Sequence, residues 1–222
     1  MKLNTTGLFD LSYTLAGDYL ARFAYPWQAL DGIKELILTL GPALGDEYEE
    51  LGAGVWVHQT AKTAPTAFLG APCIIGPGTE VRHCAFIRGS ALVGAGCVVG
   101  NSVELKNVIL FDSVQVPHYN YVGDSILGYK SHMGAGSITS NVKSDKTLVT
   151  VKNEGEAMET GRKKFGAILG DFVEVGCNSV LNPGTVIGPH SNVYPLSCVR
   201  GVVPADSIYK TGGVVVPKRK GD

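Results

Sequence analysis

A period of six residues dominates the chain from Val57 onward. Aliphatic or small residues recur at every sixth position, and glycine directly follows several of them. Neither an α-helix, with its period of 3.6, nor a single amphipathic strand, with its period of 2, produces this pattern. A short strand followed by a tight turn does, and three such units close a triangular coil of about 18 residues. The repeated positions are Val57, Thr63, Leu69, Ile75, Val81, Ile87, Val93, Val99, Leu105 and Phe111, and then Leu169, Val175, Leu181, Ile187, Val193 and Val199.

The repeat predicts an all-β fold, a left-handed parallel β-helix built from hexapeptide units. We expect the repeated residues to point inward as anchors, with glycine at the corners where the backbone torsions are unusual. The aromatic content of 8% agrees with a narrow core of small and branched aliphatic side chains. An ordinary β-sandwich is the alternative, but its strands vary in length and spacing, and the phasing from Val57 to Phe111 is unbroken.

Two regions interrupt the repeat. Residues 1–50 have helical spacing and predict a short N-terminal helical segment that could cap one end of the β-helix, with a loop at 41–54 leading into the first coil. The β-helix is predicted over 51–212, with a C-terminal tail at 213–222. The polar, lysine-rich residues 141–165 predict a projecting loop. Because a β-helix has exposed flat faces, we expect a homotrimer about its long axis.

Charge and cysteine content exclude several classes of partner. A net charge of −1 argues against binding to nucleic acid or to an anionic membrane surface. The sequence has neither a recognisable signal peptide nor a membrane-length apolar run, and its five cysteines form no Cys-x-x-Cys pair. We therefore expect a cytoplasmic protein with reduced thiols. No metal site is expected, because the histidines form no closely spaced pair.

Arg88 and Lys106 each follow an inward anchor by one residue, so both side chains are expected to point outward. They are 18 residues apart, which is one full coil, and are expected to stack at the strand spacing of about 4.8 Å. Stacked cations repel each other unless an anion bridges them, so the pair predicts a phosphate site. The alternative is two solvated surface cations paired with Glu104, which faces outward beside Lys106.

His118 lies where the six-residue phasing changes. After Pro117 the next anchors are Val122 and Leu127, each five residues on, and such a slip re-aims side chains. Imidazole titrates near neutral pH, so His118 is a candidate general base that Glu104 could orient. The alternative is a surface histidine that caps a turn. Whether the histidine meets the two cations within one chain or across a trimer interface stays open.

Several stretches of the chain are similar to known enzymes. The runs RGSALVGAGCVVGNSVELKN and PHYNYVGDSILGYKSHMGAGSITSN resemble the acetyltransferase half of bifunctional glucosamine-1-phosphate acetyltransferase/N-acetylglucosamine-1-phosphate uridylyltransferase. The stretch SDKTLVTVKNEGEAMETGRKKFGAILGDFVEVG is more similar to archaeal-type sugar-phosphate nucleotidylyltransferases that carry the same acetyltransferase tail. The early YPWQALDGI resembles the segment that joins the two domains there. The likeness covers roughly residues 25–210.

The resemblance implies roles for individual positions. The family's phosphate-binding arginine and lysine match Arg88 and Lys106, and its catalytic histidine and nearby glutamate match His118 and Glu104. Further matches are Tyr121, Asn141 and the loop residue Lys146 for the sugar phosphate, and Ala135 for coenzyme A.

The chain departs from the family at three site positions. His132 stands where the bacterial family has asparagine, which affects sugar recognition. Near the acetyl-CoA pocket, Cys177 replaces a family serine and Pro195 a family alanine. Residues 1–50 are too few for a nucleotidylyltransferase domain and contain no Gly-rich phosphate loop, so uridylyl transfer is not expected.

These expectations combine into an acetyl-CoA-dependent N-acetyltransferase that acts on glucosamine-1-phosphate or galactosamine-1-phosphate. His118 would take the amine proton, and a backbone N–H within Gly134–Gly136 would stabilise the oxyanion. No step requires a metal. Two alternatives stay open: a non-catalytic regulatory or scaffolding partner of a sugar-phosphate nucleotidylyltransferase, and an acetyltransferase for another amino sugar.

Overall fold

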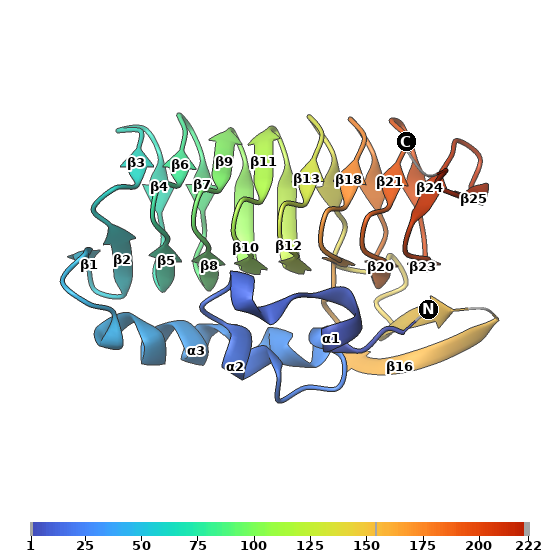
Figure 1. Cartoon of the computed structure of the whole chain (residues 1–222), viewed down its shortest axis with the longest axis horizontal. Coiled ribbons are helices and arrows are strands. Elements are labelled where there is room, and N and C mark those ends of the chain that lie inside the picture. The colour runs from blue at the N-terminus through green and yellow to red at the C-terminus, as the bar shows by residue number, and fades with distance from the viewer. Residues whose placement is uncertain (1, 154, 220–222) are drawn as a thin grey trace.

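A computed structural model of the chain describes residues 2–153 and 155–219 (Figure 1). Short parallel strands stack into a solenoid, so the parallel β-helix predicted from the repeat is confirmed. Helices and a β-hairpin lie along one side of the solenoid (Figure 1). The helical elements are α1 (Thr5–Leu8), η1 (Leu11–Tyr13), α2 (Gly17–Leu20), η2 (Pro26–Gly32), α3 (Ile33–Leu40) and η3 (Gly41–Ala43).

The strands form three faces, named here in the order in which the chain visits them. The first face contains β2 (Val55–His58), β5 (Cys73–Ile75), β8 (Ala91–Val93), the second halves of β10 (Glu104–Leu110) and β12 (Tyr121–Leu127), β17 (Ala167–Leu169), β20 (Thr185–Ile187) and β23 (Val202–Val203). The second face contains β3 (Lys62–Thr63), β6 (Glu80–Val81), β9 (Val98–Asn101), β11 (Gln115–His118), β13 (His132–Met133), β18 (Glu174–Val175), β21 (Asn192–Val193), β24 (Ser207–Tyr209) and the antiparallel β25 (Val215–Pro217). The third face contains β4 (Phe68–Leu69), β7 (Phe86–Ile87), the first halves of β10 and β12, β14 (Ile138–Thr139), β19 (Val180–Leu181) and β22 (Cys198–Val199).

The anchors pack in the centre of the solenoid, because successive side chains of a strand point to opposite faces. From Ile75 onward the predicted anchors are buried. The first coil is less well covered, with Thr63 exposed and Leu69 half-buried. Phe111 is buried but does not serve as an anchor, since Leu110 pairs with Val93 in its place and Phe111 packs on the ring of Phe9.

The change of phase falls at a different corner from the one that we expected. Val116 lies beside Val99, and Val122 follows it by six residues beside Leu105, so the coil does not slip after Pro117. Instead the corner between the third and first faces is one residue shorter in β10 and again in β12. At this corner Asn107 has φ of 56° and Asp124 has φ of 48°, in the left-handed region that Asn and Asp tolerate. The shortened corner therefore re-aims Asn107 and Asp124 rather than His118.

The first face carries an apolar stripe on its outer side as well as on its inner side. α3 packs on β8 and β10, and η2 packs on β12. The helices thus lie along this face instead of capping one end, which corrects our expectation (Figure 1). The helices and the segments beside them cover the outward residues of this face, and all of these are buried: Trp56, Ile74, Leu92, Ile109, Ile126, Ile168 and Val186.

Two segments expected to be loops contain strands. β1 (Tyr48–Gly52) pairs antiparallel with β2. Within the predicted projecting loop, β15 (Val149–Asn153) and β16 (Glu156–Arg162) form an antiparallel hairpin. Val149 and Val151 are fully buried, so the hairpin packs against the solenoid. In the described part of the chain, every helix is too short or too polar to cross a membrane.

Candidate functional site

Arg88 and Lys106 lie side by side on the third face, as their spacing predicts. β7 and β10 pair in register, and the Arg88 backbone N–H donates to the Leu105 carbonyl at 2.9 Å. Each cation nevertheless has its own carboxylate. Arg88 Nη1 lies 2.8 Å from Glu104 Oε1, and Lys106 Nζ lies 3.1 Å from both carboxylate oxygens of Asp124. The hydrogen bond with Glu104 raises the pKa of Arg88, so the guanidinium stays charged at neutral pH.

Asp124 is the centre of a polar network that sequence reasoning missed. Its side chain is only 4% exposed, and a buried carboxylate is costly unless donors surround it. Besides Lys106, the side-chain amides of Asn107 and Asn141 donate to it. These two asparagines lie 17 positions before and after Asp124. A search for polar residues 17 positions apart would have found these contacts. The 18-residue period of a regular coil does not bring the two asparagines beside Asp124.

Tyr121 extends the network along β12. Asn141 Nδ2 donates to the Tyr121 hydroxyl at 3.1 Å, so Asn141 joins the tyrosine to Asp124. Burial raises the pKa of Tyr121, which therefore keeps its hydroxyl proton at neutral pH. The ring lies over Gly123, where an added Cβ would be 2.4 Å from the tyrosine oxygen. Glycine at this position is what allows the tyrosine to lie flat on the strand.

His118 is exposed at the end of β11, opposite Asn101 on the neighbouring strand. Its backbone is held firmly: the N–H donates to Asn120 Oδ1, and the carbonyl accepts from Gly136 N. Its imidazole makes no hydrogen bond or ion pair with residues 2–153 or 155–219. Glu104 is bonded to Arg88 instead, so the predicted His118–Glu104 contact is not formed within one chain.

The positions predicted to contact coenzyme A follow one corner of the β-helix, between the second and third faces. His118 lies in the same column, through its bond to Gly136. Gly134 is required, because a Cβ there would lie 2.7 Å from the Cys177 backbone nitrogen. Gly134 N donates to Val175 O, and Gly136 N donates to His118 O, but Ala135 N has no acceptor in the described structure. The residues brought together at this corner are His118, Gly134, Ala135, Cys177 and Pro195.

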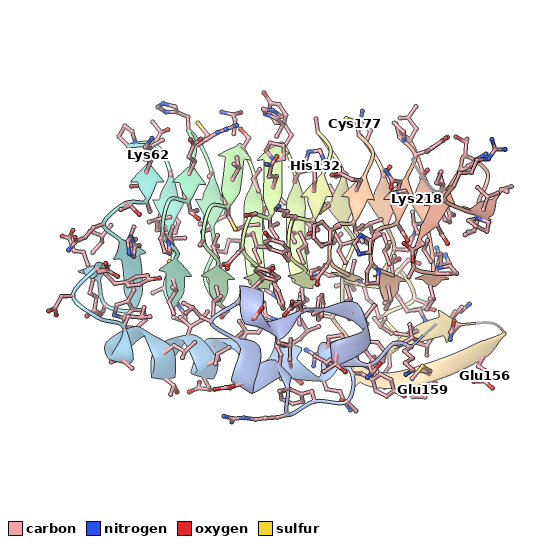
Figure 2. All side chains as sticks on the ribbon, in the orientation of Figure 1. Lys62, His132, Glu156, Glu159, Cys177 and Lys218 are labelled. Atoms are coloured by element: carbon pink, nitrogen blue, oxygen red, sulfur yellow. The ribbon has the colours of Figure 1, made fainter. Side chains whose placement is uncertain are left out.

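In the described structure, neither His132 nor Lys146 has a side-chain bond to the Asp124 network. His132 is on the second face, where its Nδ1 lies 2.8 Å from Glu174 Oε2. Figure 2 shows His132 and Cys177 on the side of the solenoid away from Glu156 and Glu159 of the hairpin. Lys146 lies in the exposed turn that precedes β15. A single chain therefore brings Arg88, Lys106, Tyr121 and Asn141 together, but not these two.

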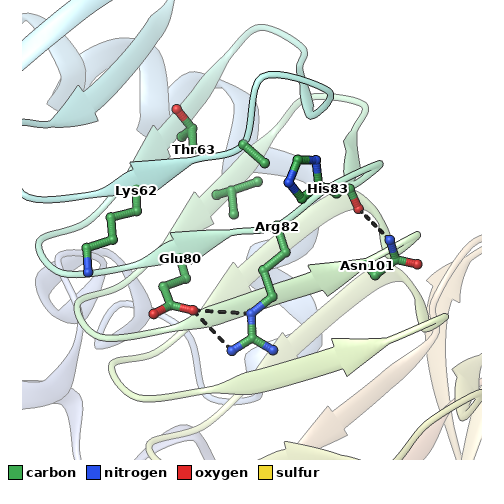
Figure 3. Close-up of a pocket in the computed structure, with 8 residues that line it drawn as sticks. Lys62, Thr63, Glu80, Arg82, His83 and Asn101 are labelled. Carbon is green, nitrogen blue, oxygen red and sulfur yellow. Dashed lines mark hydrogen bonds and ion pairs between the residues drawn. The ribbon is translucent and has the colours of Figure 1, made fainter.

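A shallow groove of about 480 Å³ on the second face was not predicted (Figure 3). Arg82 is paired with Glu80 at 3.0 Å, and Asn101 donates to the His83 carbonyl at 3.0 Å. Because Asn101 lies opposite His118, the groove leads toward the histidine. Among residues 2–153 and 155–219, no three His, Cys, Asp or Glu side chains gather in a way that could hold a metal ion.

Comparison with known families decides where this chain belongs. The family described as GMPPB C-terminal domain matches residues 72–203, which is more than half of the chain. The chain belongs to this family. It is also homologous to the hexapeptide β-helix region of bifunctional sugar-1-phosphate nucleotidylyltransferase/acetyltransferases. The resemblance seen in the sequence is therefore confirmed.

The relatives are considerably longer proteins. The bifunctional sugar-1-phosphate nucleotidylyltransferase/acetyltransferase of Sulfurisphaera tokodaii is 32% identical over 48% of this chain and 26% of its own length. The bifunctional protein GlmU of Methanococcus maripaludis is 34% identical over 52% and 28%, and that of a Nostoc species is 36% identical over 76% and 32%. The chain thus spans about a quarter to a third of the curated relatives it matches.

Solved structures are similar at lower identity. The polySia-specific acetyltransferase NeuO has a TM-score of 0.49 and 11% identity, over 71% of this chain and 80% of that chain. The acetyltransferase domain of PglB from Neisseria gonorrhoeae, in complex with acetyl coenzyme A, has a TM-score of 0.36 and 16% identity, over 82% and 64%.

Proposed function

We propose that the chain is an acetyl-CoA-dependent N-acetyltransferase of the hexapeptide family, and that its acceptor is glucosamine-1-phosphate or galactosamine-1-phosphate. The observation that carries this proposal is the network of Lys106, Asp124, Asn141 and Tyr121 beside Arg88. Connected donors and cations at one exposed face suit the hydroxyls and phosphate of a sugar phosphate. The homology with bifunctional acetyltransferases supports the same reaction.

The chemistry requires a base for the sugar amine and a donor for the oxyanion. We assign the base to His118, whose exposed imidazole has no competing partner in the described chain. The Ala135 N–H, which has no acceptor among the described residues, is the natural oxyanion donor, since its neighbours Gly134 and Gly136 already donate to carbonyls. Acetyl-CoA would then lie along the corner with Cys177 and Pro195, which places the thioester near both groups.

A homotrimer would complete this site. In one chain Glu104 bonds Arg88 rather than His118, and neither His132 nor Lys146 has a side-chain bond to the Asp124 network among the described residues. A neighbouring subunit is the simplest source of the missing contacts, because the third face and its corner are exposed. We therefore propose that the sugar phosphate binds between subunits, with Arg88 and Lys106 holding its phosphate and His132 and Lys146 completing its contacts.

The reaction can be tested directly on the full chain. Release of coenzyme A thiol from acetyl-CoA is measured over a panel of hexosamine 1-phosphates, with the corresponding N-acetylated sugars as controls because they lack a free amine. We expect thiol release with at least one amine and none with its acetylated form. Absence of turnover across the panel would exclude this proposal.

A second candidate function is a regulatory or scaffolding partner for a sugar-phosphate nucleotidylyltransferase. The pairing of both cations with carboxylates of the same chain favours it, since such a surface needs no anion to be stable. A scaffold would bind a nucleotidylyltransferase in size-exclusion chromatography without releasing thiol in the panel assay. Thiol release without such binding would instead support the acetyltransferase and exclude the scaffolding role.

A further inference from the structure

Three separate parts of the chain meet around a cavity of about 350 Å³ beside Asp124. Leu30 and Asp31 of η2 form one wall, and the shortened corner of the β-helix forms the second. The end of β16 and the residues after it, 161–164, form the third. We call this space the 161–164 cavity. Its volume falls within the range of about 300–1,000 Å³ that is usual for small-molecule sites.

The walls of the 161–164 cavity carry an excess of positive charge. Arg162, Lys163 and Lys164 all line it, whereas its acidic residues are Asp31 and Asp124. The Asp124 carboxylate is already bonded by one lysine and two amides, so it is not free to neutralise these cations. Neither Lys163 nor Lys164 makes a side-chain hydrogen bond or ion pair with residues 2–153 or 155–219.

Arg162 is the best positioned of the three cations. Its side chain is only 10% exposed, and a guanidinium that is withdrawn from water needs compensating acceptors. Nη2 lies 2.6 Å from Asp31 Oδ1, and Nε donates to the Lys164 carbonyl at 3.3 Å. These two bonds use only some of the five N–H donors of the guanidinium, so others are left for a ligand. Its carboxylate partner Asp31 is 85% exposed, so solvent screens that side of the pair and weakens it.

We propose that the 161–164 cavity is a second phosphate-binding site, distinct from the Arg88–Lys106 pair. The planar guanidinium of Arg162 presents a fork of donors that matches phosphate oxygens, and Lys163 and Lys164 add two exposed cations. Asp31 is the resident anion that a phosphate group replaces. The ligand is a phosphate ester or diphosphate, which goes beyond the proposed acceptor because it requires a phosphate group additional to the one held by Arg88 and Lys106.

The test uses inorganic phosphate as the probe and the full chain at low ionic strength, followed by phosphorus NMR. All variants are made in an Arg88→Ala background, so that the signal reports the 161–164 cavity. We expect Lys163→Ala/Lys164→Ala to weaken phosphate binding by at least about 10-fold. Lys62→Ala/Lys152→Ala removes the same charge at exposed positions elsewhere and is expected to change binding less than about 2-fold.

A variant with the opposite effect makes the test sharper. Asp31→Asn removes the resident anion and is expected to tighten phosphate binding by about 1.5- to 5-fold, the range for an ion pair whose carboxylate is screened by solvent. Equal weakening in the two double-lysine variants would mean general electrostatic attraction and would overturn the proposal. Unchanged binding in Lys163→Ala/Lys164→Ala would overturn it as well. Thermal unfolding of each variant confirms that the fold is retained.

The source of the phosphate group is identified by competition in the same background. If the group belongs to a nucleotide-linked amino sugar, a nucleoside-diphosphate hexosamine displaces inorganic phosphate at least about 10-fold better than a hexosamine 1-phosphate does. Equal displacement identifies a single phosphate group of a separate ligand. Because none of these titrations uses acetyl-CoA, this site and the proposed acetyl transfer can each fail without the other.

Discussion

The first and third faces of the β-helix have the same inward repeat but opposite outer surfaces. On the first face the central outward residues, such as Leu92 and Ile126, are apolar and fully buried. On the third face the equivalent outward positions include Phe68, Glu104 and Tyr121, which solvent reaches. Inward positions are set by the narrow core, whereas outward positions are free to differ. The outward residue of each short strand therefore decides whether a face is covered by other segments or open to solvent.

The largest expected effect comes from placing a charge at the same outward position on each face. Ile126→Asp would bury an unpaired carboxylate under the helices, and we expect a loss of more than about 4 kcal/mol in the free energy of unfolding. Phe68→Asp, at a side chain that is 57% exposed, is expected to cost less than about 1 kcal/mol. Urea unfolding measures both. Similar losses for the two variants would show that the faces are not divided in this way.

The next largest effect concerns the corner of the third face. His118→Ala is expected to lower the rate of acetyl transfer by at least about 100-fold, because it removes the imidazole that we propose takes the amine proton. The free energy of unfolding is expected to stay unchanged, since the imidazole bonds no described residue. Steady-state kinetics and urea unfolding are compared on the same sample. Normal turnover would remove the assignment of the base.

Removal of Lys106 tests the substrate side of the same face. Lys106→Ala is expected to raise the KM for the sugar phosphate by at least about 10-fold, the scale of a charge-assisted contact, with little change for acetyl-CoA. Asp124 keeps its two amide donors in this variant, which limits the structural damage. A KM that rises equally for both substrates would point to general disruption rather than to a phosphate contact.

The smallest predicted effect tests whether Tyr121 contributes to binding of the sugar phosphate. Gly123→Ala places a Cβ 2.4 Å from the tyrosine oxygen, so the ring must move and its bond with Asn141 is lost. We expect a rise of about 3- to 10-fold in the KM for the sugar phosphate, the scale of one hydrogen bond. Gly45→Ala is the matched control, because an added Cβ there meets no atom within 4 Å. Equal kinetics for the two variants would exclude a role for the tyrosine.

Sequence reasoning succeeded where a residue's place depends on the repeat alone. It placed Arg88 beside Lys106 and the anchors in the core, because a strand unit of fixed length defines both. It failed at Asp124 and Asn107, because one residue fewer per coil changes which side chains are neighbours. It also missed the stripe that includes Ile126. The apolar residues of these strands are visible in the sequence, but the pattern does not distinguish the outward residue of a strand from its inward, core residues.

The amino-acid sequence by itself determined the β-helix, the inward side of most of its strands and the stacking of two cations, because the six-residue period leaves few other ways to bury the anchors. The tertiary structure alone decided which carboxylate each cation binds, which face the N-terminal helices cover, and that Arg162 to Lys164 surround a cavity with Asp31. These contacts join residues far apart in the chain. Their geometry depends on the exact length of each corner, and no local pattern records which distant side chain completes them.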